Sequence, residues 1–118
     1  MTYKIDTKDK FDIIVPQISA FNYNMAEELI TMCAQIQKSD KSAIIDFINV
    51  SSAEDALIKE IENIHEQFYN GNLSFAVCNV TANIKMIFSK ELNIVPTLIE
   101  AIDLISMEGL ERELLGDF

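Results

Sequence analysis

Two apolar runs of strand length constrain most strongly what this chain can fold into. They read AIIDFINV at residues 43–50 and LSFAVCNV at residues 73–80. Nearly continuous apolar runs of this length are typical of strands that are covered on both faces, as in parallel sheets. The rest of the chain must therefore supply the elements that cover them.

Helical periodicity appears before, between and after these runs. Apolar side chains recur at three- and four-residue steps over residues 25–38, and again from Leu57 to Phe68 before the turn sequence NGN. A short helix is predicted at 82–90 and a long one at 96–114. Asn24 and Thr97 stand where caps are expected, each followed three residues later by a glutamate, as in a capping box.

The chain begins with two β-prone segments, TYKID and FDIIV, separated by the polar TKDK, which predicts an antiparallel hairpin. Residues 93–95 predict one more brief strand. Alternating helices and strands favour right-handed crossovers onto a parallel sheet. We therefore expect one α/β domain over residues 1–118, with a small mixed sheet of four to five strands, an N-terminal antiparallel hairpin and then mainly parallel strands, covered by four helices.

The charge balance argues against several classes of partner. With 9 Lys and Arg against 19 Asp and Glu, the formal charge is −10 and the pI about 4.3. Such a chain repels nucleic-acid backbones and anionic lipid surfaces. The charged opening MTYKIDTKDK has no apolar core of a signal peptide, and no apolar run approaches the ~20 residues that span a bilayer. We expect a cytoplasmic protein that binds neither nucleic acid nor membrane.

No residue set predicts catalysis, a metal or a cofactor. Cys33 and Cys78 lie far apart within apolar stretches, which favours buried free thiols. The single histidine, His65, has no nucleophile suggested near it, so it is interpreted as a half-exposed helix residue. Carboxylates on the second helix do not converge on one point, which favours a solvated acidic face; they are Glu54, Asp55, Glu60, Glu62 and Glu66.

The sequence NVSSAEDALI, residues 49–58, marks the junction between the first apolar run and the second helix. Ser51 with Glu54 fits a capping box and Ser52 with Asp55 a weaker one, so an ordinary helix cap explains the pattern. The carboxyl end of a sheet strand is also where open α/β folds place their binding sites, and a helix amino end favours phosphate. The position of this junction therefore favours a functional role for its residues.

The order hairpin, helix, IIDF, helix, FAVCNV, short helix, NIVPTLIEAIDLI resembles the STAS domains of bacterial anti-sigma factor antagonists over essentially the whole chain. In that family a strand leads into a D-S-S-G-L motif, and an anti-sigma factor that is also a serine kinase phosphorylates a serine of the motif, which breaks the complex. An ungapped alignment puts Glu54 on the aspartate, Asp55 and Ala56 on the two serines, and Leu57 on the glycine. Moving Ser51 and Ser52 onto the serines requires a gap.

The resemblance implies a non-enzymatic module in bacterial transcription regulation, whose partner is an anti-sigma factor or serine-kinase-like regulator. Its phosphoswitch is degenerate: either Asp55 mimics phosphate, or the domain binds a partner that does not phosphorylate it. The expected partner site comprises Ser51, Ser52, Glu54, Asp55, Ala56, Asn22 and Asn24. The alternative is a scaffold or small-molecule module of the same fold. Residues 107–118 predict an extended helical tail, through which a homodimer could form.

Overall fold

A computed structural model describes residues 2–89 and 92–116. The elements along the chain are β1 (Tyr3–Thr7), β2 (Phe11–Pro16), β3 (Ala20–Phe21), the 3-10 turn η1 (Tyr23–Met25), α1 (Ala26–Lys38), β4 (Ser42–Asp46), β5 (Ser52–Ala53), α2 (Asp55–Asn70), β6 (Phe75–Cys78), α3 (Ala82–Lys85), β7 (Ile94–Val95) and α4 (Leu98–Gly116). The apolar run at residues 43–50 contains β4 apart from its first residue, Ser42, and the run at residues 73–80 contains β6.

A five-stranded sheet forms the centre of the molecule, in the order β1-β2-β4-β6-β7. The first two strands pair antiparallel, and the pairs β2–β4, β4–β6 and β6–β7 are parallel. Every residue of β4 and β6 is buried, as strands covered on both faces require. The predicted fold class, a mixed sheet with an N-terminal hairpin and four helices, is confirmed.

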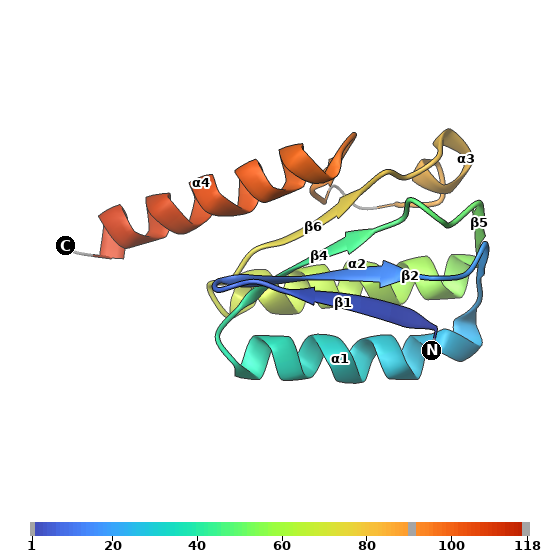
Figure 1. Ribbon diagram of the computed structural model, residues 1–118, viewed down its shortest axis with the longest axis horizontal. Helices are drawn as coiled ribbons and strands as arrows, with labels where there is room; N and C mark the ends of the chain where they lie inside the picture. The colour runs from blue at the N-terminus through green and yellow to red at the C-terminus, as the bar shows by residue number, and fades with distance from the viewer. Residues whose placement is uncertain (1, 90–91, 117–118) are drawn as a thin grey trace.

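The helices form two layers around the sheet (Figure 1). Helices α1 and α2 cover one face, where the larger apolar cluster includes Leu29, Ile45 and Ile61. Helix α4 lies on the opposite face, where Ala101 and Ile105 pack against Ile44 and other strand residues. The C-terminal half of α4 extends beyond the sheet, which lengthens the molecule to 45 Å along its longest axis (Figure 1).

The observed helix ends and their hydrogen bonds show which of the predicted caps form. The Thr97 hydroxyl accepts a hydrogen bond from the Glu100 backbone N–H at 3.2 Å, so the predicted cap of α4 is confirmed. The predicted Asn24 cap is wrong, because Asn24 lies inside η1 and α1 begins at Ala26 without a side-chain cap. After α2, the left-handed position is taken by Asn72, with φ of 60°, because asparagine tolerates this backbone conformation better than most residues.

The predicted tail lies within the last helix. Helix α4 continues without interruption through Gly109 to Gly116, and the last two residues of the predicted tail, 117 and 118, lie outside the described residues. The hydroxyl of Tyr69 on α2 donates a hydrogen bond to Glu108 Oε1 at 2.5 Å. This contact ties the middle of α4 to the helix layer on the other side of the sheet.

Candidate functional site

The loop that follows β4 is shaped by a buried carboxylate. Asp46, at the end of β4, is only 5% exposed, and its Oδ1 accepts hydrogen bonds from Ile48 N–H at 3.0 Å and Asn79 Nδ2 at 2.9 Å. These bonds turn the chain sharply after the strand, and Val50 returns to the core, where it is 3% exposed. The side chain of Ile48 is left 65% exposed at the carboxyl end of the sheet.

Two short strands that the sequence analysis missed complete this end of the molecule. Strands β3 and β5 form a separate parallel pair, in which Ala20 faces Ser52 and Phe21 faces Ala53. Backbone N–H groups of Ser51 and Ser52 donate hydrogen bonds to the Ser19 carbonyl at 2.8 and 3.0 Å. The pair was missed because two-residue strands carry no detectable alternation of polar and apolar residues.

This pairing corrects the interpretation of Ser51 and Ser52 as helix caps. Helix α2 begins at Asp55 with Glu54 at its N-cap, and no side chain caps it. The Ser51 hydroxyl donates to the Ser19 carbonyl at 3.2 Å. Both serines precede the helix, and their backbone N–H groups are engaged by the carbonyl of Ser19, directly before β3.

The carboxylate of Glu54 connects two stretches of chain that are 31 residues apart. Its Oε1 accepts a hydrogen bond from the Tyr23 backbone N–H at 2.6 Å, and the Glu54 N–H donates to the Phe21 carbonyl at 3.1 Å. The loop that carries Asn22 and Asn24 is therefore fixed beside the amino end of α2. The structure brings the two groups of predicted site residues together at one end of the sheet.

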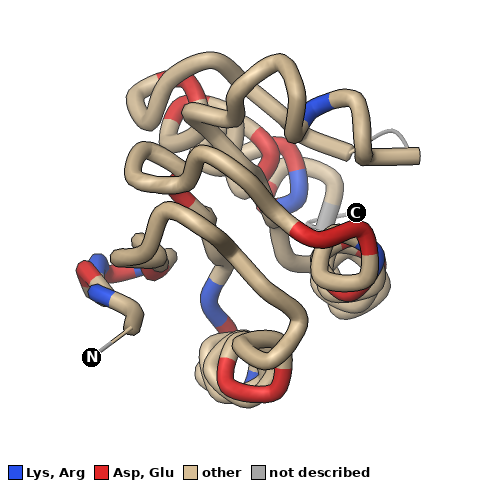
Figure 2. Tube along the Cα trace, turned by 90° about the vertical axis from the view of Figure 1, so that its right-hand side faces the viewer, with Lys and Arg blue, Asp and Glu red and all other residues tan. Residues whose placement is uncertain are grey.

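The side chains that the sequence analysis singled out are open to solvent at this end. Those of Ser51, Ser52, Glu54, Asp55, Ala56, Asn22 and Asn24 are all exposed. Asp55 lies in the first turn of α2, where the partial positive charge of the helix end stabilises a carboxylate by about 0.3–1 kcal/mol. Figure 2, which looks onto this end, shows acidic residues at the near ends of helices, in agreement with Asp55 in α2 and with Glu27 and Glu28 in α1.

Exposed apolar side chains accompany the polar ones, and sequence reasoning missed them. Tyr23 is 50% exposed, Ile48 65% and Met86 83%. Met86 follows α3, which packs beside β5. No pattern in the sequence distinguishes these residues from core residues, because their exposure depends on the turn after β4 and on the position of α3.

Burial also shifts the pKa of titratable side chains elsewhere in the described residues. Burial raises the pKa of both the Cys33 and the Cys78 thiol to about 12, so each stays protonated and unreactive at neutral pH, and the predicted buried free thiols are confirmed. Burial lowers the pKa of His65, and neighbouring Glu108 and Glu66 partly oppose that effect. Within residues 2–89 and 92–116, no cluster of three His, Cys, Asp or Glu side chains could hold a metal ion.

One residue of the predicted acidic face is in fact buried. Glu62 is 3% exposed, and its Oε2 accepts a hydrogen bond from the Ser89 backbone N–H at 2.8 Å. The interpretation of the α2 carboxylates as one solvated face is wrong at this position, because the segment after α3 folds over the helix there.

No helix in the described part of the chain is both long and apolar enough to cross a membrane.

Comparison with solved structures identifies the fold. The anti-sigma factor antagonist SpoIIAA in its unphosphorylated form superposes with a TM-score of 0.71 at 12% identity, covering 88% of this chain and 97% of that one. A Thermotoga maritima protein described as a candidate anti-sigma factor antagonist gives 0.77 at 16% identity, with 88% and 94% covered. The murine anion transporter Slc26a9 gives 0.64 at 15% identity, with 86% of this chain matched to 18% of the transporter.

The sequence itself matches no protein-family model and no curated protein. The likeness therefore rests on the arrangement of the hairpin, the parallel strands and the helices, which extends over nearly all of this chain. By its three-dimensional structure, this chain has the STAS fold of the anti-sigma factor antagonists.

Proposed function

We propose that this protein is a non-enzymatic regulatory module of the bacterial cytoplasm that binds an anti-sigma factor or a related serine-kinase-like regulator. The binding surface is the end of the molecule formed by the β4–α2 junction and the loop at residues 22–24. The position of the phosphorylated serine is taken by Asp55 and Ala56. The protein controls transcription through the partner and carries out no chemistry of its own.

The hydrogen bond from Tyr23 N–H to Glu54 Oε1 is the observation that carries this proposal. It joins two stretches that are distant in sequence into one surface, on a fold shared with SpoIIAA in both its unphosphorylated and phosphorylated forms. The predicted contact residues on that surface are exposed rather than engaged in the core. A preformed surface of this kind binds with little cost in ordering loops.

The chemistry of this end fits a partner with basic and apolar groups. The Glu54 carboxylate is bonded to Tyr23 N–H, and exposed Ile48 and Met86 lie in the segments that follow β4 and α3. Exposed apolar residues within a polar rim are typical of protein interfaces, and aromatic and methionine side chains are enriched there. The acidic groups would steer a basic partner toward the site.

The switch position carries no hydroxyl in the ungapped alignment. Asp55 supplies one permanent negative charge at the amino end of α2, where a phosphoserine would supply about −1.5 to −2. The backbone N–H groups of the neighbouring Ser51 and Ser52 are bonded to the Ser19 carbonyl. We therefore expect the protein to be in one binding state that the kinase does not change.

The test combines capture and phosphorylation. Wild-type protein and the charge-reversal variant Asp55→Lys are immobilised, bacterial lysate is passed over both, and retained proteins are identified by mass spectrometry. Wild type should retain a regulator of the anti-sigma factor or serine-kinase class, and Asp55→Lys should lose it. With the purified kinase and ATP, intact mass should show no phosphoryl group on wild type, whereas Asp55→Ser/Ala56→Ser should gain one.

The matched control is Asp9→Lys, which reverses an exposed charge in the turn between β1 and β2, at the opposite end of the sheet. This variant should retain the same partner as wild type. Retention of the partner by Asp55→Lys would refute the assigned surface. Phosphate on Ser51 or Ser52 of the wild type would show that the switch is intact and would overturn the ungapped alignment.

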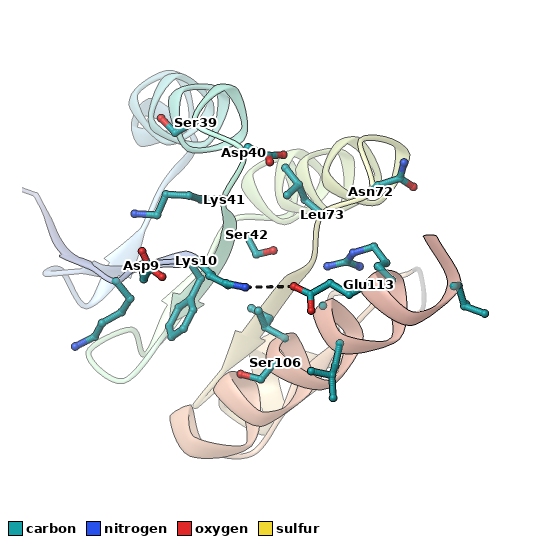
Figure 3. Close-up of a pocket in the computed structure, with 17 residues that line it drawn as sticks. Asp9, Lys10, Ser39, Asp40, Lys41, Ser42, Asn72, Leu73, Ser106 and Glu113 are labelled. Carbon is teal, nitrogen blue, oxygen red and sulfur yellow. Dashed lines mark hydrogen bonds and ion pairs between the residues drawn. The ribbon is translucent and has the colours of Figure 1, made fainter. Parts of the chain in front are cut away.

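A small-molecule module of the same fold is the second candidate, and a groove of about 1220 Å³ favours it. The groove lies between the C-terminal half of α4, the β1–β2 turn and the loops before β4 and β6 (Figure 3). Its walls combine apolar Phe11, Leu73 and Ile105 with polar Ser42 and Ser106. Native mass spectrometry of freshly purified protein tests this candidate, since a retained ligand would shift the mass of the folded species.

A further inference from the structure

Helix α4 is apolar on two opposite sides, yet only one of them is covered in the described structure. Its inner side carries Ala101 and Ile105, which are 0% and 4% exposed against the sheet. Four large apolar side chains of the outer side, Ile99, Met107, Leu110 and Leu114, are between 62% and 73% exposed. A helix that is apolar all round is normally buried all round, so the outer side lacks a neighbour.

These exposed side chains follow one face of the helix, interrupted by Asp103 between Ile99 and Met107, and are here called the outer stripe (Ile99, Met107, Leu110, Leu114). Leu110 also borders the groove. Residues separated by three, four, seven or eleven positions lie on the same face of a helix, because each turn takes about 3.6 residues. The stripe spans most of the length of α4, which is about 28 Å for its 19 residues. From residue 99 to residue 114 the stripe covers about 22 Å, which matches about four turns of a partner helix.

The other side of the overhanging half already has its contacts. Lys10 Nζ lies 3.3 Å from Glu113 Oε1 across the groove (Figure 3). Arg112 donates a hydrogen bond to Ser74 Oγ at 2.8 Å. These contacts, with the Tyr69–Glu108 hydrogen bond, hold α4 in place against the sheet. The outer stripe is therefore a fixed surface.

The charges beside the outer stripe have one sign. Glu100, Asp103 and Glu111 on α4 are exposed, and Asp103 falls on the same helix face as Ile99 and Leu110. The one cation among the residues of α4, Arg112, is half-buried and bonded to Ser74. A partner that covers the stripe therefore meets apolar groups and carboxylates.

We propose that the outer stripe of α4 binds an amphipathic helix of another protein, with leucine-like residues on one face and lysine or arginine along its borders. The apolar faces exclude water, and the basic side chains pair with Glu100 and Glu111 beside the stripe and with Asp103 within it. A second copy of this chain fits less well, because it would place the same carboxylates against one another in a protein of charge −10. The stripe lies on α4, outside the surface assigned to the regulator, so one molecule can hold both partners.

Two synthetic peptides, each as long as α4, serve as probes. Both place leucines at three- and four-residue steps, with lysine at the remaining positions in one and glutamate in the other. Fluorescence anisotropy measures their affinity for the full-length protein. The lysine peptide should bind at least about tenfold more tightly than the glutamate peptide, and this preference should shrink as salt is raised.

Variants assign the binding to the outer stripe. Leu110→Ser/Leu114→Ser should weaken the lysine peptide by about tenfold or more, since a few buried anchors carry most of an interface's affinity. Asp103→Lys should weaken the lysine peptide and strengthen the glutamate peptide. Ile30→Ser, which removes an exposed apolar side chain of α1 outside both proposed surfaces, should leave both affinities unchanged. Circular dichroism of each variant verifies that the fold is retained.

Three results would overturn the proposal. The first is equal affinity for the two peptides, and the second is unchanged binding by Leu110→Ser/Leu114→Ser. The third is a wild-type dimer in analytical ultracentrifugation that the same double variant dissociates, which would show that a second copy covers the stripe. Failure of the regulator capture described above leaves these readouts unaffected, because they involve different residues.

Discussion

Replacing Phe21 with alanine should both destabilise the protein and loosen the proposed regulator surface. Phe21 belongs to β3, and its side chain is 0% exposed. Its ring packs edge-on against Tyr3 and Phe47, with ring centroids 6.0 and 5.6 Å apart. Its carbonyl accepts the Glu54 N–H, so the residue joins the core to the start of α2.

The expected cost follows from what the substitution removes. Truncating a fully buried phenylalanine to alanine costs about 3–5 kcal/mol, through lost burial and the cavity left behind. Loss of two edge-on aromatic contacts, each of about 0.5–1.5 kcal/mol, places Phe21→Ala in the upper half of that range. A domain of this kind is stable by about 5–15 kcal/mol, so the variant should fold with much reduced stability.

Urea denaturation followed by circular dichroism measures the change in the free energy of unfolding. With a slope of about 2 kcal/mol/M, a loss of ~4 kcal/mol lowers the urea midpoint by roughly 2 M. The control is Tyr23→Ala, two residues away but 50% exposed, which should change stability by no more than about 0.5 kcal/mol. Hydrogen exchange should also accelerate at the Glu54 amide in Phe21→Ala. A loss below about 1.5 kcal/mol, or an equal loss in the control, would refute the reasoning.

Two further predictions concern titratable groups. Burial lowers the pKa of His65, so His65 binds a proton less readily in the folded protein than in the unfolded chain. Above pH 6.5, the usual histidine pKa, His65 is neutral in both states and the stability is retained. As the pH falls below 6.5, the unfolded chain takes up the proton first and stability is lost. The free energy of unfolding in urea should be lower at about pH 5.5 than at about pH 7.5 in the wild type, and the difference should be smaller in His65→Gln. An identical difference in the two proteins would contradict this prediction. Because the Cys33 and Cys78 thiols are buried with pKa values of about 12, a thiol reagent at neutral pH should leave the folded protein unmodified and label both residues in urea; fast labelling of the folded protein would show that one thiol is accessible.

Much of the sheet could be predicted from local sequence. The runs that became β4 and β6 are apolar at nearly every position, since both faces of a parallel strand are covered, and this leaves a signal that no surface strand has. The hairpin of β1 and β2 and the brief β7 were predicted for similarly local reasons. The cap at Thr97 also formed as predicted, because a cap involves residues only three positions apart.

Predictions failed where a distant segment competed for the same groups. Ser51 and Asn24 both matched a local capping pattern, yet neither caps its helix. The backbone around Ser51 is bonded to Ser19 instead, and Glu54 accepts the N–H of Tyr23. Glu62 was assigned to a solvated face by its helical position, but the segment at Ser89 covers it.

Local patterns in the sequence predicted the mixed sheet and the main helices and strands, apart from β3 and β5, because these depend on burial patterns and turn chemistry within short windows. The tertiary structure alone decided which side chains share a surface. It placed residues 22–24 beside Glu54, left Ile48 and Met86 in solvent, and left the outer stripe of α4 uncovered. Exposure depends on how the layers pack in three dimensions. The sequence pattern of an apolar helix residue is the same whether the neighbour that covers it belongs to the same chain or to a partner.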